Sequence, residues 1–209
     1  MKTIKEILES DNTDIVQDRK FLEVPCKESS LIEGEEIAAK LFRVLSDRGD
    51  GYGLAANQIG IQSRVCVINV KSPIYLVNPR IIESSGDLIY YESCLSFPNK
   101  MVRTKRFETF VVECDNIKGQ LYFDVSSIPQ SDRNMDNLDV IESVVVQHEI
   151  SHLDGKTMFD FEDKQIPIKK PKSYGRNDKI MISDGTNSLT IKYKQFEPYQ
   201  KKGYVIVNG

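Results

Sequence analysis

Residues 147–155 of this chain read Gln-His-Glu-Ile-Ser-His-Leu-Asp-Gly. This stretch closes a longer segment, 139–153, in which apolar side chains recur at helical spacing. Asp139 and Glu142 are spaced as a capping box at its start, and Gly155 marks its end. The sequence therefore predicts a helix over 139–153, with one inward stripe made of Ile141, Val144, Val145, His148 and His152.

The two histidines of that stripe predict a metal site. Side chains four residues apart on a helix lie about one turn apart, so His148 and His152 can offer ring nitrogens to one ion. Glu149 lies beside them, where a base for activating water is expected. The chain has 2 histidines and both belong to this HExxH pattern, so a coincidental pair is the weaker interpretation.

A hydrolytic metal ion normally has three protein ligands and one position open to water. Without a third histidine, the third ligand must be Cys, Asp or Glu. Met158 stands where an extended histidine motif would place its last ligand, so that motif is excluded. Glu162 is available, but no clear helical register brings it back toward the two histidines.

The four cysteines then remain as candidates for the third ligand. Cys66 and Cys114 lie in apolar, strand-like runs, where a buried small side chain is the simpler explanation. Cys26 has no neighbours that favour metal binding. Cys94 lies in a short link that ends at Pro98, a residue that favours an irregular loop. Such a loop can be directed at a helix, which favours Cys94.

Composition sets the class of protein. The chain has 209 residues, of which 40% are hydrophobic and 28% charged, as in soluble globular proteins. Its net charge of −3 argues against a protein that reads nucleic acid sequence over its whole surface. The polar N-terminus is unlike a signal peptide, and no apolar run reaches the ~20 residues of a membrane span. We expect a cytoplasmic protein, with no membrane partner and with its cysteines as thiols or metal ligands.

Charge and turn residues divide the chain. Residues 164–202 contain ten Lys or Arg against three Asp or Glu, a local balance of +7. Proline and glycine also interrupt this part, and we place a boundary near residue 168. We therefore expect a catalytic domain over 1–168 and a basic, strand-rich C-terminal extension over 169–209, with strands at 179–182, 189–194 and 204–207.

The order of the predicted elements indicates an α+β fold. A helix is predicted over 33–47, followed by strands at 64–70, 74–82 and 109–114. The run 64–70 is almost wholly apolar and should be buried on both faces. The helix over 139–153 should then pack inside mixed or antiparallel sheets that wrap around it.

A glycine-rich stretch follows the first helix. Residues 51–60 read Gly-Tyr-Gly-Leu-Ala-Ala-Asn-Gln-Ile-Gly, with Ala56 where a dinucleotide-binding motif needs its third glycine. One interpretation is a simple turn. The other is that the glycines let the backbone approach a ligand, while the Gln58 amide donates to a developing oxyanion.

Taken together and in this order, these stretches resemble a peptide deformylase. Residues 51–58 are similar to the GxGLAAxQ motif of that family, 92–96 to EGCLS and 147–155 to QHExxHLxG. The resemblance spans about residues 10–162. The combination GLAANQ and ESCLSFP is similar to the deformylases carried by some phages.

The resemblance implies a hydrolase that removes the formyl group from formyl-methionyl nascent peptides and releases formate. It implies one divalent metal ion, with Fe²⁺ expected as the native ion and Zn²⁺, Ni²⁺ or Co²⁺ compatible. The implied ligands are Cys94, His148 and His152. Glu149 would be the general base, and Gln58 and the backbone N–H of Leu95 the oxyanion donors.

Positions within the motifs and positions on the predicted helix also indicate which residues could contact a substrate. The candidates are Tyr52, Gly53, Tyr90, Ser93, Ile141, Val144 and Val145. Ordinary core packing explains the two tyrosines and the three apolar residues equally well when each is taken singly. Ser93 replaces the glycine of EGCLS, which can alter substrate preference. Ser151 replaces a charged or polar residue between the histidines, and we expect it on an outward position. Arg106 is expected to pair with Glu92 as a structural brace.

Two other functions fit parts of the pattern. A different HExxH metallohydrolase, a peptidase or amidase, would share the helix but not the motifs of Gln58 and Cys94. A deformylase-like binding module without activity would have a broken catalytic set, whereas this set is complete. The resemblance also implies a C-terminal helix, for which the basic extension shows no pattern. That extension suits either a ribosomal surface or a solvated basic face.

Overall fold

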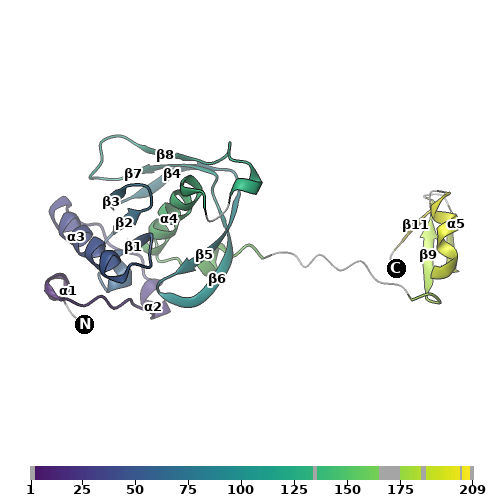
Figure 1. Cartoon of the computed structure of the whole chain (residues 1–209), viewed down its shortest axis with the longest axis horizontal. Helices are drawn as coiled ribbons and strands as arrows, with labels where there is room; N and C mark the ends of the chain where they lie inside the picture. Colours follow the sequence, from purple (N-terminus) through teal and green to yellow (C-terminus); the bar gives the residue numbers. More distant parts are fainter. Residues whose placement is uncertain (1–2, 134–135, 165–174, 185–186, 203, 208–209) are drawn as a thin grey trace. The chain divides into compact units, whose positions relative to one another are not determined.

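The structure, a computed structural model, describes residues 3–133, 136–164, 175–184, 187–202 and 204–207 (Figure 1). The chain divides into two units, Met1–Lys164 and Gln165–Gly209. The boundary predicted near residue 168 falls outside the described residues. Within the part of the chain that is described, no helix is both long and apolar enough to cross a membrane.

The segment predicted as a helix over 139–153 forms α4 (Leu138–Leu153), which is buried along most of its length. Its cap differs from the prediction. The side chain of Asn137 accepts hydrogen bonds from the backbone N–H groups of residues 139 and 140. Asp139 and Glu142 form no capping box; their carboxylates pair with Lys71 instead.

A three-stranded antiparallel sheet separates α4 from α3 (Leu31–Arg48), the helix predicted over 33–47. Alternate side chains of its central strand face opposite sides. Val65 and Val67 pack in the core with α3, and Cys66 and Ile68 pack with α4. This explains the apolar run predicted as buried on both faces. The strands, in sheet order, are β1 (Gly53–Ala55), β2 (Val65–Asn69) and β3 (Pro73–Val77).

The single strand predicted over 74–82 is wrong. The chain leaves β3 at Asn78, whose φ of 54° is left-handed, and Pro79 supplies no backbone N–H to continue a ladder. Both polar atoms of the Asn78 amide bind the backbone of Ser29 and hold this turn. The following strand joins a second sheet, whose order is β4 (Arg80–Ser85), β7 (Thr109–Glu113) and β8 (Leu121–Asp124).

A hairpin of β5 (Leu88–Cys94) and β6 (Phe97–Arg106) supplies the other side of the site. Cys94 is the last residue of β5, so it ends a strand instead of lying in an irregular loop. Figure 1 shows α4 between this hairpin and the sheet of β4, β7 and β8. Side chains of α4 pack on Leu88 of β5 and on Phe110 of β7. The predicted α+β fold, with antiparallel sheets around a central helix, is confirmed.

The remaining elements of the first unit are short. The N-terminal segment is held on α3 because Lys40 Nζ donates to the backbone oxygens of Ser10 and Asn12, at 2.6 and 3.1 Å. The same segment contacts the site, since the backbone N–H of Val16 donates to the carbonyl of Gln58 at 2.8 Å. These elements are α1 (Ile4–Glu9), α2 (Arg19–Leu22), η1 (Ala56–Ile59), η2 (Gln130–Asp132) and η3 (Met158–Phe161).

The second unit contains an antiparallel sheet, as its three predicted strands suggested. Its order is β10 (Ser188–Lys192), β9 (Lys179–Ser183) and β11 (Val205–Ile206). Ile180 and Ile182 of β9 are buried. The strand predicted over 189–194 ends at residue 192, where η4 (Tyr193–Gln195) begins and leads into α5 (Phe196–Gln200).

We expect Asn137→Ala to lower the free energy of unfolding by about 1 kcal/mol, because two backbone N–H groups at the start of α4 lose their acceptor. Asp139→Ala removes only an exposed ion pair and should cost less than about 0.5 kcal/mol. Urea unfolding followed by circular dichroism measures both. Equal losses in the two variants would contradict the assignment of the cap.

Candidate active site

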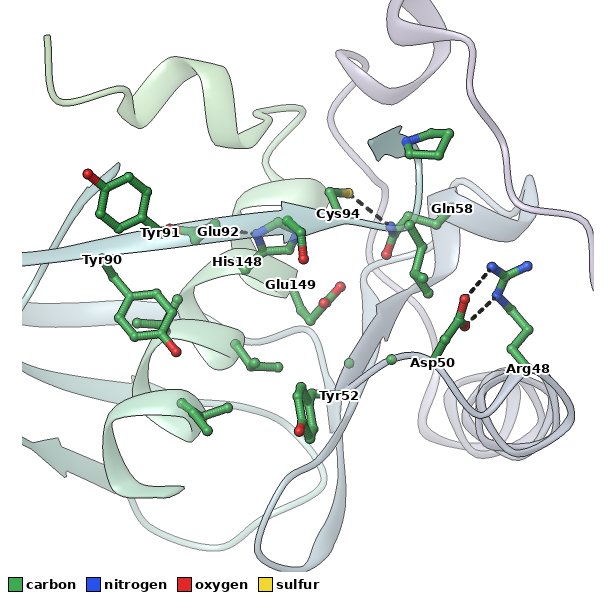
Figure 2. A pocket seen from close by; sticks show the side chains of 18 of the residues that line it. Arg48, Asp50, Tyr52, Gln58, Tyr90, Tyr91, Glu92, Cys94, His148 and Glu149 are labelled. Carbon is green, nitrogen blue, oxygen red and sulfur yellow. Dashed lines mark hydrogen bonds and ion pairs between the residues drawn. The ribbon is translucent and has the colours of Figure 1, made fainter. Parts of the chain in front are cut away.

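Cys94, at the end of β5, meets the two histidines of α4, which follow much later in the sequence. Figure 2 shows Cys94 and His148 on these two elements. One ligand atom each from Cys94, His148 and His152 lies within 4.8 Å of the others. Cys94 Sγ lies 3.2 Å from His152 Nε2. All three residues are buried. One thiol and two imidazoles at these separations can coordinate a single ion.

Glu92 orients the first of the two histidines. Its Oε2 lies 2.6 Å from His148 Nδ1, so the other ring nitrogen, Nε2, is left to face the ligand site. Arg106 donates to both carboxylate oxygens, at 2.6 and 2.8 Å, which is the predicted brace. The link to His148 was missed in the sequence. A signal existed, because Glu92 and Cys94 lie two residues apart on a strand and so share one face.

The charges around the site favour a cation. Burial raises the pKa of Glu92, but the hydrogen bonds and positive charge of Arg106, assisted by His148, outweigh burial and hold it well below its ordinary value. Burial lowers the pKa of His148, yet Cys94 and Glu92 together raise it well above its ordinary value. The groups that attract a proton here also attract a metal ion, so the residues fit a divalent cation.

His152 differs from His148 because burial, followed by the positive charges of His148 and Arg106, holds its pKa well below the ordinary value. A neutral imidazole is the form that binds metal ions. Its Nε2 faces Cys94, as required of a ligand.

Glu149 lies on α4 directly after the first histidine and points into the cavity (Figure 2). Burial raises the pKa of its carboxyl group to about 7. Within the described ranges, its Oε2 atom has no hydrogen-bond partner. The backbone of Gly53 lies against it, since a Cβ there would be 2.7 Å from Oε1. A carboxyl group with such a pKa can both accept and return a proton near neutral pH.

Both the oxygen and the nitrogen of the Gln58 side-chain amide form hydrogen bonds. Its Oε1 accepts from the backbone N–H of Ala55 at 2.9 Å. Its Nε2 donates to Ser96 Oγ at 3.2 Å and lies 3.6 Å from Cys94 Sγ. The nitrogen therefore faces the ligand site, where an oxyanion donor is needed. Leu95, the other predicted donor, lies in the turn between β5 and β6 and lines the same cavity.

These residues border a cavity of about 460 Å³. Ile141 and Val144 are buried at its wall, whereas Tyr52 is 56% exposed at its rim. The cavity therefore has an apolar interior and an aromatic entrance. The structure places every predicted substrate contact on its lining, namely Tyr52, Gly53, Tyr90, Ser93, Ile141, Val144 and Val145.

The same lining includes residues that sequence reasoning missed. Arg48 Nε and Nη2 donate to the two carboxylate oxygens of Asp50, at 3.1 and 3.0 Å, beside the glycine-rich stretch (Figure 2). The only sequence feature that could have placed Arg48 and Asp50 at the cavity is their position immediately before that stretch. Tyr91, Pro98 and Asn99 also line the cavity.

The expectation that Ser151 points outward is wrong. Ser151 is buried, and its Oγ accepts from Arg106 Nη1 at 2.9 Å while it donates to the backbone oxygen of Gln147 at 2.6 Å. Ser151 follows His148 by three residues and so lies on a neighbouring part of the helix surface, where Arg106 of β6 packs against it. Ser151 thus helps to fix the arginine that holds Glu92.

Comparisons with known proteins agree with this arrangement. The polypeptide deformylase family model matches residues 12–166. A peptide deformylase of Heliobacterium modesticaldum is 38% identical over 136 residues, which cover 62% of this chain and 82% of the relative. Peptide deformylase 3 of Shewanella oneidensis is 31% identical over 157 residues, which cover 72% of this chain and 88% of the relative.

Solved structures show the same fold. The peptide deformylase of Thermotoga maritima is 25% identical with a TM-score of 0.58, and the match covers 71% of this chain and 95% of the other. The structure from Synechococcus elongatus, in complex with actinonin, is 26% identical with a TM-score of 0.59, over 78% and 86% of the two chains. The chain therefore belongs to the peptide deformylase family and is a metal-dependent hydrolase.

Proposed function

We propose that Cys94, His148 and His152 hold one divalent metal ion, and that the chain removes the formyl group from formyl-methionyl peptides and releases formate. The observation that carries this proposal is the convergence of the three ligand atoms within 4.8 Å beside a buried carboxyl group. Fe²⁺ is the proposed native ion, and Zn²⁺, Ni²⁺ and Co²⁺ suit the same donor set. The family implies formylated peptides as substrates. The proposed location is the cytoplasm, where such peptides are made.

Hydrolysis of a formamide needs a nucleophile, charge stabilisation and a proton for the leaving amine. A bound divalent cation lowers the pKa of water and polarises the formyl oxygen. Glu149 takes the proton from the attacking water and returns it to the amine as the C–N bond breaks. Its buried position, with Oε2 unpartnered within the described ranges, leaves it available for both transfers.

Two donors are assigned to the oxyanion that develops on the formyl oxygen. Gln58 supplies Nε2, which its bonds to Ala55 and Ser96 hold toward Cys94. Leu95 supplies its backbone N–H from the adjacent turn. Loss of one such donor typically costs about 2.7–4 kcal/mol of transition-state stabilisation.

The cavity is proposed to take the methionine side chain and the start of the peptide. Ile141, Val144 and Val145 supply apolar contacts from α4, and Tyr52 and Tyr90 line the same cavity. β1 is an edge strand of its sheet and β5 has one partner, so both have an edge that can bind peptide backbone. We propose that the cavity also binds actinonin, which is present in the Synechococcus elongatus structure.

Replacement of Glu149 by Gln should leave the metal content unchanged and reduce kcat at least about hundredfold, because the proton acceptor is lost while the shape is kept. The measurement is formate release from formyl-Met-Ala by anaerobically purified protein. An unformylated peptide serves as the control for a peptidase. Wild-type protein that cleaves only the unformylated peptide would favour another metallohydrolase, and a metal-loaded wild type without either activity would favour a binding module.

Cys94→Ala should lower the metal content of the purified protein several-fold, because one of three ligands is removed. Cys66→Ala is the matched control, since Cys66 is also a buried cysteine but packs in the core under α4. Metal analysis and unfolding measurements on both variants separate ligand loss from instability. Unchanged metal in the Cys94 variant would disprove the ligand assignment.

A separate role is proposed for the C-terminal extension over 169–209, which we treat as distinct from a catalytic domain over 1–168. We propose that it contacts the anionic surface of the ribosome. Lys179 and Lys192 are direct cross-strand partners in β9 and β10, where like charges repel. Phosphate groups would relieve that repulsion, and Arg176 and Lys194 add positive charge nearby in the chain.

Removal of residues 170–209 should abolish sedimentation of the chain with ribosomes at low salt and leave turnover of formyl-Met-Ala unchanged. Binding by the full chain should weaken steeply as salt rises, because it depends on phosphate contacts. Equal sedimentation of both forms across the salt series would show that the extension is only a solvated basic surface.

A further inference from the structure

Asn57 is a fully buried polar residue next to the proposed oxyanion donor. It lies on η1 between Ala56 and Gln58, and none of its surface is exposed. Its Nδ2 donates to the backbone carbonyl of His152 at 2.7 Å. The side chain of Asn57, in the glycine-rich segment, is therefore hydrogen-bonded to the backbone of His152, which we propose as a metal ligand.

Each of these two residues also has a buried polar side-chain atom without a partner. In the ranges that the structure describes, Asn57 Oδ1 and His152 Nδ1 have no hydrogen bond. The orientation of the amide is set by its surroundings, because the opposite orientation would place its oxygen against the carbonyl oxygen of His152. Asn57 thus presents an acceptor beside the residue that needs one.

His152 needs that acceptor for a chemical reason. Its Nε2 faces Cys94 Sγ at 3.2 Å and is the atom available to a metal ion. A neutral imidazole that binds through Nε2 carries its proton on Nδ1. Ligand histidines almost always donate that N–H to a fixed acceptor, as His148 does to Glu92. For His152 no such acceptor is in direct contact among the described residues.

We propose that Asn57 is the positioning residue of His152: its nitrogen holds the backbone of the histidine, and its oxygen accepts the ring Nδ1–H through one bridging water. The inference rests on the proposed metal site. Asn57 itself touches neither metal nor substrate, and its effect acts through the orientation of the imidazole. Loss of such a partner typically weakens metal binding about 10–100-fold.

The test compares Asn57→Thr with Asn57→Val. The two variants have nearly the same shape, but only Thr retains an oxygen that can accept a hydrogen bond. The readout is the dissociation constant for Co²⁺, measured by chelator competition, together with the visible spectrum of the Co²⁺ protein. We expect binding about 10–100-fold weaker with Val than in the wild type, and recovery of most of that loss with Thr.

Ser143→Ala is the matched control. Ser143 is buried on α4, the helix that carries His152, and its Oγ also has no partner among the residues that the structure describes. Its side chain forms no hydrogen bond with a proposed metal ligand among those residues. Its Co²⁺ affinity should equal that of the wild type. Unfolding of the metal-free proteins checks stability, and Asn57→Ala replaces Val if the latter does not fold.

The outcomes separate this inference from the proposed function. Equal Co²⁺ affinity of Asn57→Val, Asn57→Thr and wild type would overturn the role of Asn57 while the metal site stands. An equal loss in Ser143→Ala would also overturn it, because general damage to α4 would then explain both. A wild type that binds no Co²⁺ would instead disprove the proposed metal site.

Discussion

The structure depends on the burial of a helix that carries polar side chains. Residues 147–149 and 151–152 of α4 are all polar and all lie in the interior. Burying such groups without partners costs on the order of 1–3 kcal/mol each. The surrounding strands therefore supply hydrogen-bond partners. Among these, Glu92 of β5 binds His148 and is itself bound by Arg106 of β6 through both of its oxygens. Removing one member of a buried ion pair like Glu92 and Arg106 typically costs about 3–5 kcal/mol.

This constraint also explains the architecture around the helix. β1 and β2 cover one side of α4 with apolar side chains, and the hairpin of β5 and β6 brings the polar partners. Glu92 and Cys94 lie on the same face of β5, separated by the exposed Ser93. One face of β5 thus carries both the thiol that we propose as a metal ligand and the carboxylate that orients His148. The buried neighbours of Ser93 place its side chain on the opposite face of β5, so the serine does not fill the ligand site.

Much of this could be predicted from sequence because the signals are local. The spacing of His148 and His152 and the apolar run in β2 depend only on helix and strand periodicity. The residues that were missed act across distances in the chain. Ser151 was expected to face outward because the sequence of the helix does not reveal that Arg106 of β6 packs against this residue. Asn137 was missed as the cap because Asp139 offers an equally plausible local pattern, and only the pairing of Asp139 with Lys71 decides between them.

The two histidines of the site differ in the hydrogen bonding of their Nδ1 atoms, and this difference would affect a bound metal ion. His148 has a carboxylate partner that is itself held by Arg106. Among the described residues, Nδ1 of His152 has no direct hydrogen-bond partner, and its proposed partner is the neutral amide of Asn57. A carboxylate attracts the imidazole N–H more strongly than a neutral amide oxygen does. In the proposed metal site the two histidines would therefore differ in donor strength, with His148 the more basic ligand. In the proposed site a bound metal ion would take Cys94 as a thiolate ligand, and the negative charges of this ligand and of Glu92 would reduce the positive charge of the ion. Such an ion would be a weaker Lewis acid, and the proposed catalysis would then depend more on Glu149 and Gln58 than on the ion alone.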